Sequence, residues 1–372
     1  MNTAALRVRA AAAAAMLGLA AHAAVAQILI GQTVGVTGAV AATVKESMLG
    51  AQLYLDQVNA KGGIGGEKVE VVTLDDAFDV KQAVENAHTL IEQRGVLALF
   101  MSRGTPHTEA IDKVLEQHKV AMVGPSTGAM SLRQPVRPYI FNVRASYQRE
   151  AMRAMELLHT IGVTRVAILH VDDGFGADAL QGALQGLRQA GLEPAAVAKF
   201  NRSTPDFTPL LPALKAADPQ SVLVIGSGTA VVDAIASLHK AGVGGQYLTL
   251  SNNASGGFIK LLGTQAKGVI VSQVMPDSIS YPLVKEATGL ARAKGVDELS
   301  PAMLEGFASA KVLVEGLRRA GPKPTRASLW QALNSLGQWD LGGMALTYTP
   351  ADHSGLSFAD LSIIGTNGKF RR

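Results

Sequence analysis

The segment spanning residues 96–128 constrains the fold of this chain most strongly. Two apolar runs, 96–101 and 120–123, each read as a short buried strand, and the segment between them reads as a helix up to about His118. A strand, a helix and a second strand in this order predict a parallel pair, because the helix returns the chain to the edge where the first strand began. The sequence therefore predicts an open, mainly parallel sheet, a kind that binds ligands at the carboxyl ends of its strands.

Both of these strands are followed by turns that carry hydroxyl groups. The first turn contains Thr105, which we expect to cap the following helix, with Pro106 in the first helical turn. The second turn contains Ser126 and Thr127. Because neighbouring parallel strands end at the same edge of a sheet, these hydroxyls and the free N–H groups of helix ends should meet there, where they suit an anionic ligand group.

The rest of the chain alternates strands and helices in two successive series, which predicts an α/β fold with two lobes. The second series begins near Tyr147. Short extended stretches are candidate crossings between the lobes near residues 144–147, 272–276 and 347–351. The predicted division is residues 27–145 with 275–349 for the amino-terminal lobe, and residues 146–274 with 350–372 for the carboxy-terminal lobe.

Residues 1–26 are predicted to be a Sec-type signal peptide. Arg7 and Arg9 precede an apolar run that is too short to span a membrane comfortably, and Ala24-Val25-Ala26 supplies a small-residue cleavage pattern that disfavours a retained anchor. The chain has no cysteine, which excludes a lipoprotein anchor, a disulfide and a thiol nucleophile. We therefore expect a periplasmic protein that is exported, is not a lipoprotein and is held together by packing alone.

Composition argues against several kinds of partner. The formal net charge is +4, part of which belongs to the two arginines of the signal region, and the other charges are interspersed. With aromatic residues at only 5%, neither nucleic acid nor a polybasic membrane contact is expected. The histidines have no ligand spacing in the sequence, and Gly226-Ser227-Gly228 lacks the third glycine of a dinucleotide fingerprint. We expect no metal and no cofactor.

Four stretches carry a family resemblance: Gly50-Ala51 through Asn59-Ala60-Lys61-Gly62-Gly63-Ile64, Asp75-Asp76 with Lys81-Gln82-Ala83, Gly104-Thr105-Pro106, and residues 120–127. In these stretches the chain resembles the leucine/isoleucine/valine-binding branch of the type I periplasmic solute-binding proteins. The resemblance implies two Rossmann-like lobes with mainly parallel sheets, joined by a three-crossing hinge. It also implies a small ligand trapped between the lobes, and delivery of that ligand by a monomer to an ABC permease of the inner membrane in amino acid transport.

The resemblance further implies which residues touch the ligand. In the family, hydroxyls and main-chain N–H groups of the first lobe hold the ligand carboxylate, and the matching residues here are Thr105, Ser126 and Thr127. The alternative is that these residues merely cap helices. The ring that the family stacks over the ligand matches Phe175, whose alternative role is a core aromatic, and Tyr147 is a further expected wall of the cleft.

The second lobe departs from the family at two expected ligand positions. Ser227-Gly228 stands where members that take α-amino acids place a tyrosine, and Ser251-Asn252-Asn253 stands where they place a carboxylate for the ligand ammonium. A buried ammonium without a partner costs several kcal/mol. Either Asp173, Asp277 or Glu305 substitutes, or the ligand is a carboxylate or amide without an amine. Arg103 and Arg144 lie near the cleft and hinge, in a solvated, interlobe or ligand-contacting role.

Two other functions stay open at this point. The pattern Gly124-Pro125-Ser126-Thr127-Gly128 matches a nucleophile elbow, so a secreted esterase would use Ser126 with Asp172 or Asp173 and with His239 or His353. The expected oxyanion loop lacks a His-Gly-Gly run, and we predict that the protein is not an enzyme. The other possibility keeps the fold but makes the protein an exported sensor that signals to a membrane receptor.

Overall fold

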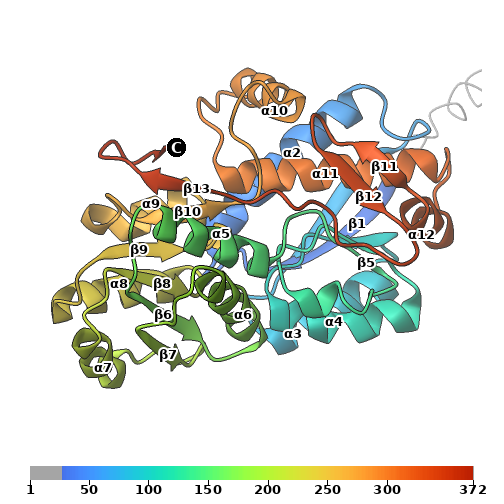
Figure 1. The fold of residues 1–372 in the computed structure, drawn as a ribbon. Helices are drawn as coiled ribbons and strands as arrows, with labels where there is room; N and C mark the ends of the chain where they lie inside the picture. Colours follow the sequence, from blue (N-terminus) through green and yellow to red (C-terminus); the bar gives the residue numbers. More distant parts are fainter. Residues whose placement is uncertain (1–26, 372) are drawn as a thin grey trace, which may run out of the picture.

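The computed structural model describes residues 27–371, which form two α/β lobes that lie side by side (Figure 1). The predicted signal peptide lies outside the described residues. The first lobe is built on a parallel sheet in the order β2-β1-β3-β4-β5. Its strands are β1 (Gln27–Val34), β2 (Lys68–Asp75), β3 (Ala98–Phe100), β4 (Met122–Val123) and β5 (Ile140–Phe141). The predicted neighbours β3 and β4 do pair, with Leu99 opposite Met122.

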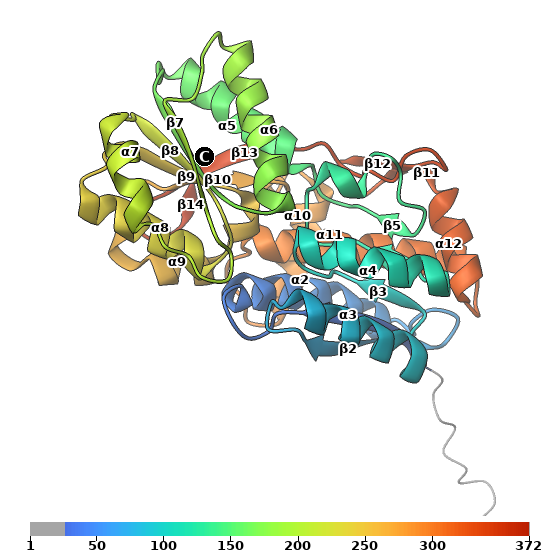
Figure 2. The same cartoon turned by 90° about the horizontal axis from the view of Figure 1, so that it is seen from below.

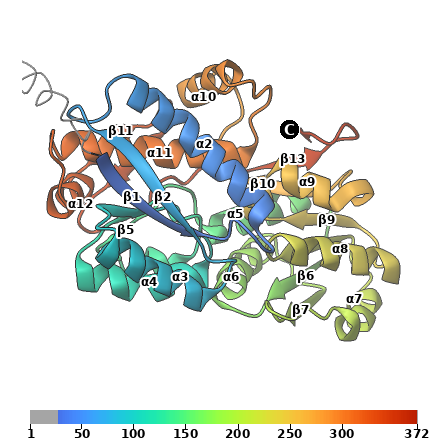
Figure 3. The same cartoon turned by 180° about the vertical axis from the view of Figure 1, so that it is seen from behind.

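Helices cover both faces of this sheet. One face carries α2 (Ala41–Ala60), α10 (Pro282–Ala293), α11 (Pro301–Arg319) and α12 (Arg326–Asn334). The other carries α3 (Val80–His88), the π-helical segment η1 (Thr89–Gln93) and α4 (Thr105–His118), as Figure 3 shows from behind. Phe100 packs in the core on the α11 side and Leu99 in the core on the α4 side. Burial of both faces explains why the strands read as continuous apolar runs.

The second lobe is built on a larger sheet in the order β14-β13-β10-β9-β8-β6-β7, in which β13 pairs antiparallel with both β10 and β14 and all the other pairs are parallel. Its strands are β6 (Val166–Val171), β7 (Ala196–Phe200), β8 (Ser221–Ile225), β9 (Gln246–Thr249), β10 (Ile270–Gln273), β13 (Asp360–Ile364) and β14 (Phe370–Arg371). Its helices are α5 (Tyr147–Thr160), α6 (Gly174–Gln189), α7 (Leu211–Ala216), α8 (Thr229–Ala241) and α9 (Gly256–Leu262), seen apart from the first lobe in Figure 2.

The chain crosses between the two sheets three times, after β5, after β10 and before β13. A small hairpin of β11 (Gly337–Asp340) and β12 (Ala345–Tyr348) precedes the third crossing. Leu356 still packs in the core of the first lobe. The predicted fold class is therefore confirmed, while the assignment of single residues to each lobe stays a prediction. In residues 27–371, no helix combines the length and the apolar character that crossing a membrane requires.

One local feature of the second lobe differs from the sequence-based expectation. Helix α9 was not predicted, because Gly256 and Gly257 occupy its first turn and glycine disfavours a helix. The helix is nevertheless supported by Ser255, whose hydroxyl accepts the N–H of Phe258, and by the carboxylate of Glu46 on α2, which accepts two N–H groups at its amino end. Tertiary contacts therefore outweigh local propensity at this position.

Candidate ligand site between the lobes

The two hydroxyl turns meet at the carboxyl edge of the first sheet, as predicted. Thr105 Oγ1 and Thr127 Oγ1 are hydrogen-bonded at 2.8 Å, and both residues are buried. The prediction that Thr105 caps α4 is wrong: the cap position is Gly104, whose φ of 97° suits glycine, and Thr105 is the first helical residue. Its hydroxyl is therefore directed to the facing turn and not to the helix backbone.

Ser126 connects the second turn to helix α11. Its backbone N–H donates to the carbonyl of Ser102 at 2.7 Å, and its hydroxyl donates to Glu305 Oε1 at 3.0 Å. After β4 the chain continues without a regular α-helix, with only the short 3₁₀ turn η2 (Met130–Leu132). The strand, turn and helix context of a nucleophile elbow is therefore missing, and the partner of the serine is a carboxylate instead of a histidine.

Arg144, in the first crossing, ties the two lobes together. Its guanidinium donates to the carboxylate of Glu150 on α5 and to the hydroxyl of Ser251, and its Nη1 lies 3.6 Å from Glu305 Oε2. Burial by itself lowers the pKa of Arg144, but the carboxylates of Glu305 and Glu150 outweigh burial and raise this pKa above its ordinary value. This arginine is fully charged and its charge is balanced within the protein.

Arg103 lies in a different electrostatic environment. It is only 3% exposed, and its Nη2 donates to the backbone oxygen of Asn252, in the opposite lobe, at 2.5 Å. Within residues 27–371, no carboxylate oxygen comes within 4.0 Å of its guanidinium. Burial lowers the pKa of Arg103 because the desolvated cation is less favourable than in water. A buried cation without an ion pair is costly, and an anionic ligand group would offset that cost.

A small cavity lies against Arg103 and Ser126. Its remaining walls are apolar, except for two polar side chains of β1 and α2, and comprise Gln32, Val34, Val44, Ser47, Met48 and Met101. The volume is about 10 Å³, which is roughly enough for one water molecule. In the present arrangement of the lobes the cavity thus combines a guanidinium and a hydroxyl with aliphatic walls, on a scale smaller than an amino acid.

The two predicted aromatic residues lie against each other. The ring centroids of Tyr147 and Phe175 are 4.5 Å apart, and the Arg144 guanidinium lies 4.8 Å from the centroid of the Tyr147 ring. Both rings belong to the hydrophobic core of the second lobe, and neither lines the cavity. Tyr147 therefore adjoins the charged network, and Phe175 packs behind it.

The three predicted residues of the second lobe make interlobe or loop contacts. A Cβ atom added to Gly228 would lie 1.8 Å from the carbonyl oxygen of Ala39 in the first lobe, so the close approach of the lobes depends on this glycine. Ser251 receives the hydrogen bond from Arg144, and Asn252 donates through Nδ2 to the carbonyl of Gly226. The contact of the second lobe with Arg103 comes from the backbone oxygen of Asn252 and not from the Asn252 side chain.

Of the three acids considered as partners for a ligand ammonium, Glu305 is the one in this network. Asp173 caps α6 through the N–H groups of Phe175 and Gly176, and it pairs with Arg202. Asp277 is exposed in the connection after β10. Glu305 is 6% exposed and projects from α11 toward Ser126 and Arg144.

The sequence left the central charges of the site without a defined role. Arg103 and Arg144 were recognised only as residues near the cleft, and Glu150 was not singled out. Arg144 and Ser251 are 107 positions apart, and Arg103 and Asn252 are 149 positions apart. The available signal was the presence of arginines directly after a strand and at a crossing, but their partners depend on how the lobes meet.

Comparisons with known proteins agree with this architecture. A model of the family described as periplasmic binding protein matches residues 27–359. The Leu/Ile/Val-binding protein homolog 3 of Brucella melitensis is 28% identical over 341 residues, which cover 90% of each chain. A substrate-binding periplasmic protein from Ralstonia solanacearum has a TM-score of 0.83 and 33% identity, covering 92% of this chain and 99% of that one. A possible leucine/isoleucine/valine-binding protein from Rhodopirellula baltica has a TM-score of 0.87 and 25% identity, covering 95% and 98%.

The chain belongs to the periplasmic binding protein family. Within that family, the relatives confirm the resemblance to the leucine/isoleucine/valine-binding branch of the type I proteins. Members of the family bind small molecules for ABC transport, and they are binding proteins and not enzymes.

Proposed function

We propose that this chain is the substrate-binding component of an ABC importer and that its ligand is a small aliphatic α-amino acid. The observation that carries the proposal is the arrangement of charge around Ser126. Arg103 forms a backbone bridge with Ser126, and Glu305 accepts the Ser126 hydroxyl, yet the guanidinium and the carboxylate do not come within 4.0 Å of each other. Two opposite charges that flank one residue and do not pair with each other suit a zwitterion, whose carboxylate and ammonium can each meet one of them.

Each part of an amino acid has a matching group in this site. The ligand carboxylate would bind Arg103 together with the hydroxyls of Thr105, Ser126 and Thr127, and its ammonium would bind Glu305. The aliphatic walls of the cavity suit a branched side chain. The names of several relatives, which are Leu/Ile/Val-binding proteins, support the same ligand class.

The proposed mechanism is capture by closure of the lobes. The ligand groups named above belong to the first lobe, and the second lobe covers them through the Asn252 carbonyl on Arg103 and the Ser251 hydroxyl on Arg144. A ligand that also contacts this cover would shift the population toward the closed state. The cavity has room for about one water molecule in the present arrangement, so a bound amino acid would hold the lobes slightly further apart. We further propose that residues 1–26 direct export to the periplasm, where a monomer presents its ligand to a permease.

A carboxylate or amide without an amine is the second candidate ligand. It is favoured by one specific observation, namely that Glu305 already interacts with Ser126 and Arg144. In that case Glu305 would serve only to position these two groups, and the ligand would need no cation.

Calorimetry with leucine and with 4-methylpentanoate, its amine-free analogue, separates the two candidates. The amino acid proposal predicts that the mature protein binds leucine more tightly, and that Glu305→Gln removes most of this preference because the ammonium loses its partner. Tighter binding of 4-methylpentanoate by the wild-type protein would reject the amino acid proposal. Thermal unfolding against the remaining amino acids and small amides then gives the range of ligands, since a ligand that binds only the native state raises the midpoint.

A further inference from the structure

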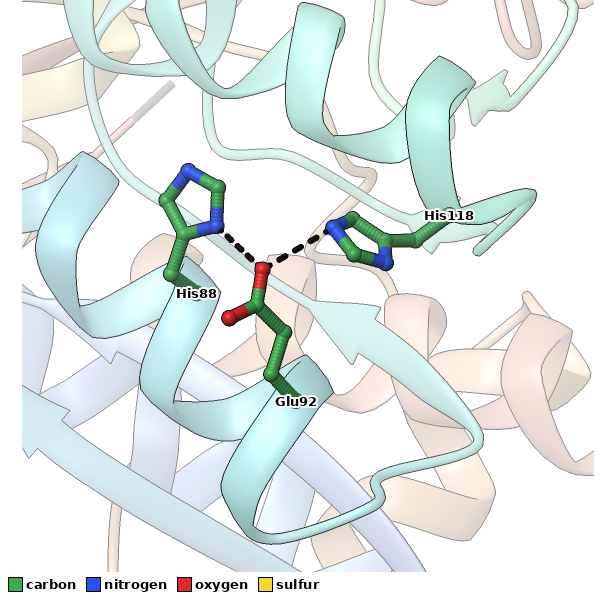
Figure 4. A group of neighbouring side chains, drawn as sticks. All are labelled: His88, Glu92 and His118. Atoms are coloured by element: carbon green, nitrogen blue, oxygen red, sulfur yellow. Dashed lines mark hydrogen bonds and ion pairs between the residues drawn. The ribbon is translucent and has the colours of Figure 1, made fainter.

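Two histidines and a glutamate converge on the outer face of the first lobe (Figure 4). His88 is the last residue of α3, Glu92 lies in the π-helical segment η1, and His118 is the last residue of α4. His88 Nδ1 lies 2.7 Å from Glu92 Oε1, and His118 Nε2 lies 3.1 Å from the same oxygen. One ligand atom from each of the three side chains lies within 4.8 Å of the other two.

The sequence gives little indication of this cluster. His88 and Glu92 are one helical turn apart, and their turn belongs to a helix that widens into the π-helical segment η1. His118 comes from the far end of the next helix and is brought close by the packing of α3 and η1 on α4, which share one hydrophobic core. The expectation of no metal rested on sequence spacing alone, which does not register a ligand from a neighbouring helix.

The two imidazoles share one carboxylate oxygen, and only one of them is in hydrogen-bond geometry with it. His118 Nε2 is shielded from solvent and lies 3.1 Å from Glu92 Oε1, but within residues 27–371 no acceptor or donor meets it in hydrogen-bond geometry. The side chains of His88, Glu92 and His118 are 40%, 46% and 22% exposed, so solvent reaches the group from outside. The two ring nitrogens and the carboxylate oxygen therefore face a common point. A cation at this point could bind all three atoms.

We propose that His88, Glu92 and His118 bind a divalent transition metal ion, for which Zn²⁺ is the best match. His88 Nδ1, His118 Nε2 and a Glu92 oxygen would be the protein ligands, and water would take the fourth position. Zinc is held by imidazole and carboxylate at about 2.0–2.2 Å in tetrahedral geometry, which sets donor atoms roughly 3.3 Å apart. Small side-chain movements are therefore enough to reach this geometry from the present separations. Imidazole ligands favour zinc, copper and nickel over magnesium and calcium.

The proposed ion would join the end of α3 and η1 to the end of α4. Both elements pack on the face of the sheet opposite α11, so the site is separate from the groups that surround Ser126. The expected consequence is stabilisation of the first lobe by mass action, because the metal binds the folded arrangement of three ligands. This inference does not depend on the identity of the transported ligand.

The test uses the mature chain prepared without a polyhistidine tag and treated with a chelator. Titration calorimetry with ZnCl₂ should give one equivalent of bound metal, and Zn²⁺ should raise the unfolding midpoint whereas Mg²⁺ and Ca²⁺ should not. The variants H88Q, E92Q and H118Q should each weaken Zn²⁺ binding by at least about tenfold, because each removes one of three protein ligands. The matched control is H159Q, which alters an exposed histidine on α5 in the other lobe.

Two results would overturn the proposal. One is the absence of stoichiometric binding to the wild-type protein at 100 μM free Zn²⁺. The other is that H88Q, E92Q and H118Q, folded by circular dichroism, bind zinc as well as H159Q does. If a variant fails to fold, Co²⁺ titration of the wild-type protein decides the question, since an absorption band of a four-coordinate cobalt site is expected and its absence counts against the site.

Discussion

Replacing Arg103 by methionine tests the central claim about the ligand site. Methionine keeps an unbranched chain of similar reach but removes the guanidinium. Removing one partner of a buried, hydrogen-bonded charge pair costs about 2–5 kcal/mol of binding free energy. Because each 1.4 kcal/mol is a factor of ten, Arg103→Met should weaken binding of the preferred amino acid by about 30-fold to 4,000-fold.

The same substitution should affect the stability of the ligand-free protein much less. It removes a charge-assisted hydrogen bond to the Asn252 carbonyl, which contributes about 1.5–3 kcal/mol. It also removes a buried cation that has no carboxylate within 4.0 Å among residues 27–371, and this relief acts in the opposite direction. We expect the two effects to cancel to within about 1 kcal/mol in the free energy of unfolding.

Calorimetry gives the affinity and urea unfolding gives the stability of Arg103→Met. The control is Arg149→Met, which removes an arginine that is 44% exposed and pairs with Glu156 at the surface of α5, and which should leave the affinity unchanged. A variant of Arg103 that retains wild-type affinity within threefold would refute the reasoning, since the guanidinium would then not contact the ligand.

Two further predictions concern closure and pH. Glu46 on α2 accepts two N–H groups at the amino end of α9 in the other lobe, and Glu46→Gln weakens this acceptor. We expect a loss of about 1–2 kcal/mol in the closed state, which calorimetry should show as about 5- to 30-fold lower ligand affinity. The free energy of unfolding of each lobe should be unchanged. Burial raises the pKa of the Asp76 carboxyl to about 6, above its value in the unfolded chain. The protonated carboxyl therefore contributes to stability below about pH 4, and this contribution is lost as the pH rises through 6. Asp76→Asn should therefore stabilise the protein by up to about 3 kcal/mol at pH 8 but not at pH 4, as measured by urea unfolding, and equal effects at both pH values would contradict the assignment.

The backbone of the ligand site was predictable because it follows from local signals. The apolar runs around Leu99 and Met122 gave two paired strands, and the hydroxyls of Thr105 and Thr127 consequently meet at one edge of the sheet. These features depend on the direction of parallel strands, which the order of strand, helix and strand already determines.

The charges of the site were not predictable in the same way. Glu150 sits in the first turn of α5 with nothing in its neighbourhood to distinguish it from a surface glutamate, but it is fully buried and accepts hydrogen bonds from Arg144 and Ser272. Its role depends on tertiary structure, because its partner Ser272 belongs to a strand that is 122 positions away in the sequence. Likewise, Gly256 and Gly257 begin a helix with the help of Glu46 in the other lobe, whose carboxylate accepts their N–H groups.

The difference between the two arginines suggests how closure and charge are linked. The charge of Arg144 is balanced within the protein, because its guanidinium forms ion pairs with Glu150 and Glu305. Arg103 instead is buried against a backbone oxygen of the opposite lobe. In the proposed closure of the lobes, this contact would desolvate a cation whose direct acceptor is neutral. That desolvation opposes closure of the empty protein, and a ligand carboxylate would remove the penalty. On this argument a neutral ligand of the same shape would close the lobes less completely, because it leaves the cost of burying Arg103 in place.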